Sequence, residues 1–325
     1  MSIPTIYDIA KRAGVGIATV SRVMNGNLRV SAATRELVES AMGDLGWRPN
    51  RAARRLARRG PDRPRVAVLM PFFSTSFYFM VTRPLAAAVA AADMDLLIQD
   101  VHDRQAKQRL LDRICAERSA EGLVVCSMGL GSERLAQLAK LRIPVVVMDY
   151  PLPGPPRVCV DNLGGGRLGA QLVQERGARR PALLTGPATI YAFRQREEGF
   201  AAQVGASAPV ARAPLVTREA GRQATLELLE GHPRLDALVT VNDVLALGAL
   251  DALRELGRRV PDEVQVLGFD DLPLMDLAGL STIRQPMPAF GEWAGRAITA
   301  LVRDPAAKID SLDLELIPVL RKTTR

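Results

Sequence analysis

The sequence predicts an α/β protein with a separate all-α head at its N-terminus. From Arg65 onward, short apolar runs alternate with amphipathic helical stretches, a rhythm typical of parallel sheets covered by helices. The chain has 325 residues, 48% of them apolar, which exceeds the usual size of one domain. Residues 1–63 contain 12 Lys or Arg and 5 Asp or Glu, so they carry +7 of the net charge of +8. A basic head on a nearly neutral body favours binding to a polyanion, although a solvated basic tail would show the same asymmetry.

The sequence also favours a cytoplasmic protein without a membrane span. Its apolar runs are short and interrupted by charge, and its N-terminus lacks the features of an export signal. Cys115, Cys126 and Cys159 are odd in number and lack CxxC spacing. We therefore expect buried thiols rather than a disulfide framework or a zinc site.

Three short helices are expected in the head. The first follows Thr5 as N-cap and ends at Gly14, and the second spans residues 17–24. The third begins after Ser31 and includes Leu37 among its apolar residues. A tight turn between the first two helices makes this a helix-turn-helix unit.

The second helix of such a unit enters the major groove, so its outward side chains decide what it can read. Arg22 can make a bidentate contact to guanine, whereas Ile17 and Ala18 can offer only apolar contact, for example to thymine methyl groups. Any short helix can expose an arginine, so Arg22 by itself is weak support. Side chains better suited to phosphates are Thr5, Thr19, Ser21 and Asn25.

The stretch TIYDIAKRAGVGIATVSRVMNGN, residues 5–27, resembles the head of LacI/GalR family regulators. The resemblance continues through residues 30–57. It implies a sequence-specific DNA-binding transcription regulator, a repressor, with a head at 1–46, a hinge at 47–63 and an effector-binding core at 64–325. One departure is Gly16, where the family commonly has Ser or Thr; glycine can cap a helix but offers no hydroxyl to a phosphate.

The hinge segment is too short to form a stable helix by itself in water. In the family, two such segments of a dimer become helices on the operator and insert a leucine into the minor groove, which bends the DNA. Leu56 occupies that place here, although an ordinary charged linker would have a similar composition. The hinge residues that the resemblance assigns to DNA binding are Asn50, Ala53, Arg54 and Leu56.

The body is expected to form two lobes with a cleft between them. A glycine-rich break at residues 161–169 separates two groups of apolar runs, and ligands bind at the carboxyl ends of parallel strands. The resemblance implies a two-lobed core like that of periplasmic sugar-binding proteins. Its chain would cross between lobes near Asp161, near residues 285–288 and near the strand LELIPVL. The N-lobe would then hold residues 64–160, 288–302 and a late strand, and the C-lobe 161–287 and the C-terminal segment.

The resemblance also assigns effector contacts, which suit a sugar better than a lipid. The acids and the amide can share hydrogen bonds with hydroxyls, the arginine can donate a rigid fork, and the aromatic rings can cover an apolar sugar face. Singly, an acid after a strand is often a helix cap and an aromatic is usually core. Val216 stands where the family often has an aromatic residue. The assigned contacts are Phe77, Tyr78, Asp149, Tyr150, Arg196, Asn242 and Asp270.

Other functions are less well supported. Gly164, Gly166 and Gly169 satisfy GxGxxG, but this pattern lies mid-chain instead of after the first strand of a dinucleotide fold, so we expect no cofactor. His102 and His232 lie far apart with no metal-like or nucleophile motif nearby, so we expect surface residues and no enzyme. A transport binding protein would need an export signal, and a nucleoid protein would bind random DNA as well as a palindrome.

The expected partners are a near-palindromic DNA operator, a small-molecule effector and a second copy of the chain. No tetramerising heptads follow the final LRKTTR, so we expect a homodimer. Effector binding would change the lobe arrangement and with it the order and spacing of the paired hinges.

Overall fold

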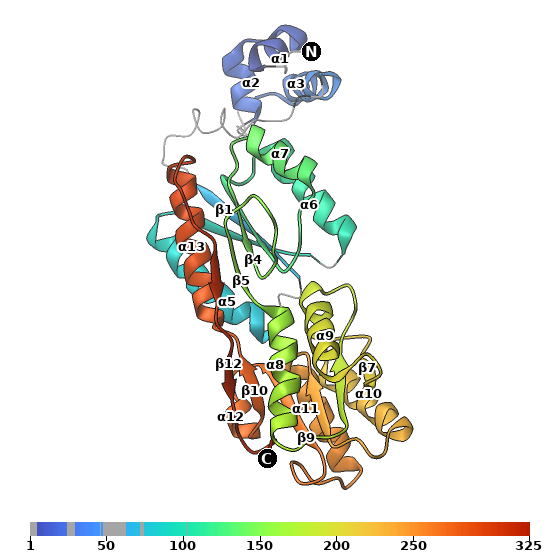
Figure 1. The fold of residues 1–325 in the computed structure, drawn as a ribbon. Helices are drawn as coiled ribbons and strands as arrows, with labels where there is room; N and C mark the ends of the chain where they lie inside the picture. The colour runs from blue at the N-terminus through green and yellow to red at the C-terminus, as the bar shows by residue number, and fades with distance from the viewer. Residues whose placement is uncertain (1–4, 25–29, 46, 48–62, 72–74, 102) are drawn as a thin grey trace. The chain divides into compact units, whose positions relative to one another are not determined.

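The computed structural model describes residues 5–24, 30–45, 47, 63–71, 75–101 and 103–325. The three N-terminal helices pack around their own small core, and the α/β region forms a second, much larger core (Figure 1). Each part is described here by itself.

The head consists of α1 (Ile6–Ala13), α2 (Ile17–Met24) and α3 (Ala32–Asp44). Its core contains Ile9, Val20, Val38 and Trp47, all buried. Gly14 ends α1 in the left-handed region, with a φ of 67° that glycine adopts without strain. This tight turn is the one the sequence predicts.

The caps of α1 and α3 use short polar side chains. The Asp8 carboxylate accepts hydrogen bonds of 2.7 Å from both the backbone N–H and the hydroxyl of Thr5, and these bonds lower the pKa of Asp8. The Ser31 hydroxyl accepts from the backbone N–H of Thr34, which confirms Ser31 as the cap of α3. Leu37 lies in α3 as expected and is 56% exposed, because the buried face of the helix runs through Val38 and Ala41.

The first sheet of the body, called here the N-sheet, is entirely parallel. Its strand order is β11-β5-β4-β3-β1-β2. The strands are β1 (Arg65–Met70), β2 (Asp95–Asp100), β3 (Gly122–Cys126), β4 (Val145–Met148), β5 (Arg157–Val160) and β11 (Leu312–Leu314). The helices in this part of the sequence are α5 (Ser76–Ala91), α6 (Arg104–Glu117) and α7 (Ser132–Lys140), and α13 (Met287–Arg303) packs against α5 and β3.

The second sheet, called here the C-sheet, has the order β12-β10-β9-β8-β6-β7, with only β12 antiparallel. Its strands are β6 (Pro181–Thr185), β7 (Val210–Arg212), β8 (Ala237–Thr240), β9 (Gln265–Asp270), β10 (Ser281–Arg284) and β12 (Ile317–Val319). Its helices are α8 (Asn162–Glu175), α9 (Tyr191–Val204), α10 (Arg218–Gly231), α11 (Asp243–Glu255) and α12 (Met275–Ala278).

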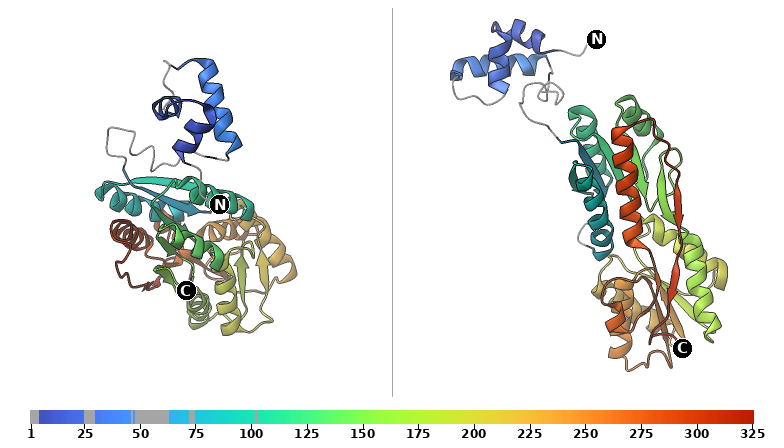
Figure 2. Two further views of the ribbon diagram at one scale, coloured as in Figure 1. Left: turned by 90° about the horizontal axis from the view of Figure 1, so that it is seen from above. Right: turned by 90° about the vertical axis from the view of Figure 1, so that its left-hand side faces the viewer.

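The chain passes between the sheets three times (Figures 1 and 2). It leaves the N-sheet after β5, returns from β10 to α13, and leaves again between β11 and β12. Both sheets are therefore built from discontinuous segments. Residues just after a passage are well placed to sense a change in the arrangement of the two sheets.

The glycines of α8 allow a close helix packing. A Cβ on Gly166 would collide with the backbone carbonyl of Arg196 in α9, and a Cβ on Gly199 would collide with the carbonyl of Leu163 in α8. Of the three glycines in the GxGxxG pattern, Gly166 is therefore explained by packing between α8 and α9. Its consequence is that the backbone of Arg196 is held directly against α8.

The three cysteines of the body lie in its interior. Cys115, Cys126 and Cys159 are buried free thiols, as the sequence predicts. Among the described residues, no cluster of His, Cys, Asp or Glu could hold a metal ion. Within the same ranges no helix is both long and apolar enough to cross a membrane. His232 is exposed at the end of α10, whereas His102 lies outside the described residues.

Candidate functional site

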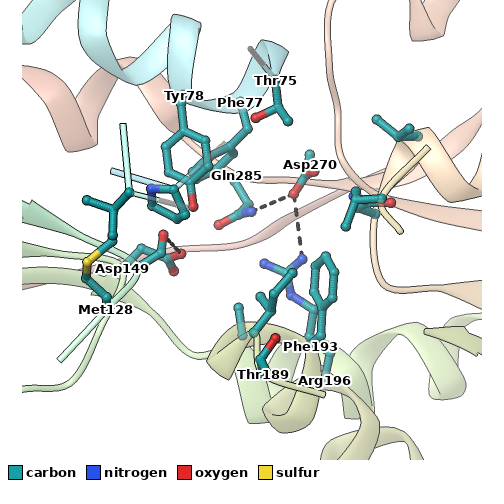
Figure 3. Close-up of a pocket in the computed structure, with 18 of the residues that line it drawn as sticks. Thr75, Phe77, Tyr78, Met128, Asp149, Thr189, Phe193, Arg196, Asp270 and Gln285 are labelled. Atoms are coloured by element: carbon teal, nitrogen blue, oxygen red, sulfur yellow. Dashed lines mark hydrogen bonds and ion pairs between the residues drawn. The ribbon is translucent and has the colours of Figure 1, made fainter. Parts of the chain in front are cut away.

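A cavity of about 360 Å³ lies at the carboxyl ends of strands from both sheets. The N-sheet contributes Asp149 after β4, and the C-sheet contributes Asp270 at the end of β9 (Figure 3). Parallel strands place their ligand-binding loops at this edge. Six of the seven effector contacts assigned by the resemblance line the cavity: Phe77, Tyr78, Asp149, Arg196, Asn242 and Asp270.

Arg196 is the centre of a buried polar network. Its side chain is 4% exposed, and its guanidinium lies 3.6 Å from the ring centroid of Phe269. The guanidinium donates through Nε to Asn162 Oδ1 at 2.9 Å and through Nη1 to the carbonyl of Val241 at 2.6 Å, and Nη1 lies 3.7 Å from Asp270 Oδ1. These contacts fix the guanidinium before any ligand binds.

Asp149 is tied to the same network through Asn162. The Asp149 carboxylate accepts from the Ser127 hydroxyl at 2.8 Å and from the Asn162 amide at 3.4 Å. Burial raises the pKa of Asp149, and the nearby Arg196 guanidinium offsets part of this effect. The N-sheet side of the cavity is therefore linked through Asn162 to Arg196 on α9.

Asp270 faces Arg196 from the C-sheet, and Gln285 holds it there. The Gln285 side-chain amide donates to Asp270 Oδ1 at 2.6 Å, and its backbone N–H donates to the carbonyl of Asp270 at 3.1 Å. The Gln285 Oε1 atom is buried and has no hydrogen-bond partner. Because a buried acceptor without a donor is costly, this atom is available to a ligand hydroxyl or N–H group.

A second buried acid lies behind Asp270. Asp243 accepts from the Thr282 hydroxyl at 2.6 Å and from the backbone N–H of Leu272 at 2.8 Å. Burial raises the pKa of Asp270 to about 7, and burial together with the Asp270 charge raises the pKa of Asp243 to about 8. Asp149, Asp270 and Asp243 are buried around Arg196, the buried arginine of this network, which favours a ligand rich in hydrogen-bond donors.

The remaining wall is apolar. Phe77 packs edge-on against Tyr78 with ring centroids 5.1 Å apart, and Phe193 lies on the same side of the cavity as Arg196 (Figure 3). Val216 also lines the cavity, at the position where the sequence lacks an aromatic residue. Such a wall can cover the apolar face of a sugar ring.

The outward face of α2 offers a second candidate site. Ile17, Ala18 and Arg22 are exposed, and Thr19 and Ser21 are partly exposed. These are the side chains expected to face DNA bases and phosphates. Thr5, another predicted DNA contact, is exposed and donates its hydroxyl to Asp8. The remaining predicted DNA contacts lie outside the described residues: Asn25, Asn50, Ala53, Arg54 and Leu56.

Two family descriptions match different parts of the chain. Residues 5–50 match the description "Bacterial regulatory proteins, lacI family", and residues 170–324 match a periplasmic binding protein-like domain. The chain is 31% identical to the HTH-type transcriptional regulator CelR of Thermobifida fusca, over 98% of both chains. The chain belongs to the lacI family of bacterial regulatory proteins.

Further relatives and solved structures agree with this assignment. The chain is 30% identical to the regulator GalR of Escherichia coli, over 91% of this chain and 89% of GalR. The structure of a CelR–cellobiose complex matches with a TM-score of 0.70 and 28% identity, covering 98% of this chain and 99% of that one. A lac repressor dimer bound to operator and the anti-inducer ONPF matches with a TM-score of 0.71 and 28% identity, covering 99% of both. As a member of the family, the chain is a DNA-binding transcription regulator, which acts where the bacterial chromosome lies, in the cytoplasm.

One residue assigned by the lacI-family resemblance lies apart from the cavity. Tyr150 packs against Tyr191 with ring centroids 4.8 Å apart and lines a different hollow, near the first and third passages between the sheets. Asp149 adopts a left-handed conformation with a φ of 52°, so the chain turns sharply between the two residues. The adjacency of Asp149 and Tyr150 in the sequence does not reveal this turn.

Three further residues of this lacI-family cavity were missed by sequence reasoning. Gln285, Phe193 and Asn162 complete the cavity or its polar network. Asn162 directly follows Asp161 at the first passage and Gln285 stands at the second, so the predicted crossings were the available signal. Asn242 lines the cavity but also caps α11, because its side-chain oxygen accepts from the backbone N–H of Leu245 at 3.0 Å.

Proposed function

We propose that this lacI-family regulator represses transcription as a homodimer on a near-palindromic operator, and that a sugar in the cavity controls its affinity for DNA. Relatives support each part. CelR has been captured with cellobiose, and the lac repressor as a dimer on its operator. The relatives carry the names of transcription regulators, so we infer that the cavity binds its ligand without catalysing a reaction.

The observation that carries the sugar assignment is the set of buried polar groups at one cavity. Asp149, Arg196 and Asp270 are each 7% exposed or less and converge on a space lined elsewhere by apolar side chains. A lipid would leave these groups unsatisfied. Ligand hydroxyls can both donate to the acids and accept from the arginine, which makes a polyol the best match.

The same network suggests how the ligand would be coupled to DNA binding. Asn162 and Gln285 stand at two passages between the sheets and bond to Asp149 and Asp270, respectively. A ligand held by both acids would favour one arrangement of the two sheets over another. Because binding energies of two ligands on one protein are reciprocally linked, that preference would alter operator affinity. The predicted hinge, residues 47–63, would carry the change to the head.

The sugar assignment is tested by a thermal-shift screen of the full chain against cellobiose, ribose, galactose and a set of purines. A ligand at 100 times its Kd should add about 2.7 kcal/mol to the free energy of unfolding and raise the Tm accordingly. An operator titration with and without the hit then shows whether the ligand releases DNA or strengthens its binding. A purine hit with no response to any sugar would contradict the sugar assignment.

The DNA assignment is tested at Arg22. Arg22→Ala should cost about 1–3 kcal/mol on the cognate operator, because a bidentate contact to guanine is lost, and much less on random DNA. The measurement is a binding titration on both DNAs at matched salt. Equal losses on the two DNAs would contradict base reading, and equal wild-type affinity for the two would favour a nucleoid-structuring protein.

A further inference from the structure

The cavity also contains a pair of cations that the network around Arg196 does not use. Arg104 and Lys107 belong to the first turn of α6, and both line the cavity. They follow β2, which is an edge strand of the N-sheet. Asp149 follows the interior strand β4, and Asp270 is the last residue of the interior strand β9. Asp149 and Asp270 therefore belong to other elements than these two cations, and Asp103, which precedes Arg104, also lines the cavity.

Lys107 is partly buried without an acid to neutralise it. Its ammonium donates to the carbonyl of Gly129 at 3.0 Å, and burial and the neighbouring Arg104 both lower the pKa of Lys107. The acid next in sequence, Asp103, accepts from the backbone N–H of Ala106 in the first turn of α6. Among the described residues, neither Arg104 nor Lys107 forms an ion pair within 4.0 Å. Arg104 is exposed, whereas the partly buried ammonium of Lys107 is a positive charge that an anion would stabilise.

The cations lie within reach of a ligand held at the acids. The Lys107 ammonium bonds Gly129, two residues from Ser127, whose hydroxyl bonds the Asp149 carboxylate. Lys107 and Asp149 both line the cavity, so one ligand can contact both.

The part of the cavity wall formed by Gln285 and Asp270 attracts hydrogen-bond donors. Gln285 is 2% exposed, its Oε1 atom lacks a partner, and Asp270 lies beside it. Hydroxyls satisfy such acceptors, whereas an anion would be repelled by Asp270. A ligand that satisfies both parts of the wall must carry hydroxyls at one end and negative charge at the other.

We propose that the effector is an anionic sugar, with its hydroxyls at Asp270 and Gln285 and its phosphate or carboxylate at Arg104 and Lys107. This inference rests on the proposed function, since it names the class of sugar that the same cavity takes. A phosphate and a carboxylate share the chemistry that the two cations recognise. A sugar phosphate and a sugar acid are therefore distinguished by experiment.

The test is a calorimetric titration of the full chain with matched sets of probes. Each set contains a neutral sugar, its phosphate and its acid, for example glucose, glucose 6-phosphate and gluconate, with equivalent sets for galactose and ribose. In at least one set the phosphate or the acid should bind about 10-fold or more tightly than the neutral sugar. Tighter binding of the phosphate identifies the effector as a sugar phosphate, and tighter binding of the acid identifies it as a sugar acid.

Two variants and a matched control assign that preference to the cavity. Lys107→Gln and Arg104→Gln should each reduce affinity for the anionic probe by about 10-fold and leave affinity for the neutral sugar unchanged. Arg109→Gln removes one charge from the same helix at an exposed position that does not line the cavity. This variant should change neither the affinity for the anionic probe nor the affinity for the neutral sugar. Loss of the preference in the Lys107 and Arg104 variants also excludes binding of the anion to the basic head.

Equal affinity for neutral and anionic members of every set would overturn the inference and leave the proposed function standing. A preference for anions that survives in the Lys107 and Arg104 variants would also overturn it. If no sugar of either kind binds, the sugar assignment itself fails, and the inference fails with it.

Discussion

Asp270 has an unfavourable backbone conformation, and Gln285, which follows the neighbouring strand β10, holds it there. Its φ is 116°, a region that side chains other than glycine rarely adopt. The backbone and the side chain of Gln285 both donate to Asp270, and these two bonds stabilise the conformation. Strain held by surrounding contacts is often found at ligand sites, which agrees with the proposed role of Asp270.

We predict that Asp270→Asn reduces effector affinity by about 10- to 100-fold, because one charge-assisted acceptor is lost while the shape is kept. Operator affinity without effector should barely change, since the head is a separate unit. Calorimetry with the ligand identified by the screen, together with operator titrations, checks both. Unchanged effector affinity in the variant would remove Asp270 from the site.

The raised pKa of Asp270 also predicts how stability depends on pH. The pKa of an aspartate in the unfolded chain is about 3.9. Burial raises the pKa of Asp270 in the folded protein to about 7. Between these values the folded protein binds more protons than the unfolded chain, so the free energy of unfolding should fall as pH rises from about 4 to about 7. Urea unfolding at several pH values should show a shallower fall for Asp270→Asn. Asp243 contributes in the same direction, so some dependence should remain.

At the scale of elements, close helix pairs position the cavity side chains. Gly166 and Gly199 allow α8 and α9 to touch through their backbones. Gly221 and Gly248 do the same for α10 and α11, and Gly291 brings α13 against the carbonyl of Val81 in α5. Because α9 carries Arg196, the packing of α8 against α9 decides where the guanidinium lies.

We predict that Gly199→Ala lowers the free energy of unfolding by about 1–3 kcal/mol, because its methyl group would collide with the carbonyl of Leu163. Effector affinity should fall as well, since α9 must shift with Arg196. The matched control is Gly231→Ala, at a helical position with nothing within 4 Å, which should be neutral or slightly stabilising. Equal effects of the two substitutions in denaturant unfolding would contradict this account of the packing.

At the scale of the whole molecule, charge and ligand sensing are divided between different parts of the chain. Residues 1–63 carry +7 of the net +8, and the sugar-sized cavity belongs to the α/β region. The proposed coupling between them runs through the hinge, residues 47–63. Within that segment the structure describes Trp47, which packs in the head core, and Arg63. The roles of the hinge residues therefore stay predictions from the sequence.

We predict that Leu56→Ala weakens operator binding and reduces the DNA bend, because the apolar wedge between base steps is lost. Ligand affinity and dimer formation should be unchanged, since the resemblance assigns Leu56 to the minor groove and not to the effector contacts. A circular-permutation gel shift measures the bend, and calorimetry measures ligand binding. A normal bend would identify the segment as an ordinary linker.

Several features could be read from residue order alone. Short apolar runs such as RVAVLM and VQVLGF are recognisable as strands because a strand buried on both faces needs continuous apolar side chains. β7 was not anticipated, because it has three residues and mixed polarity, and the late strand expected at LELIPVL is two short strands, β11 and β12, in different sheets. Such edge strands are defined by their pairing partner, which lies far away in the chain.

The sequence by itself determined the family, the helix-turn-helix head, the alternation of strands and helices, and the residue types after the strands. These are local properties, set by periodicity, caps and turns. Only the tertiary structure decided that Asp149, Arg196 and Asp270 share one network while Tyr150 lies apart from it. It alone also revealed the unpartnered oxygen of Gln285 and the cations of α6 on the same cavity. The physical reason is that a side chain's surroundings depend on backbone turns and helix packing between residues more than a hundred positions apart, which no local pattern encodes.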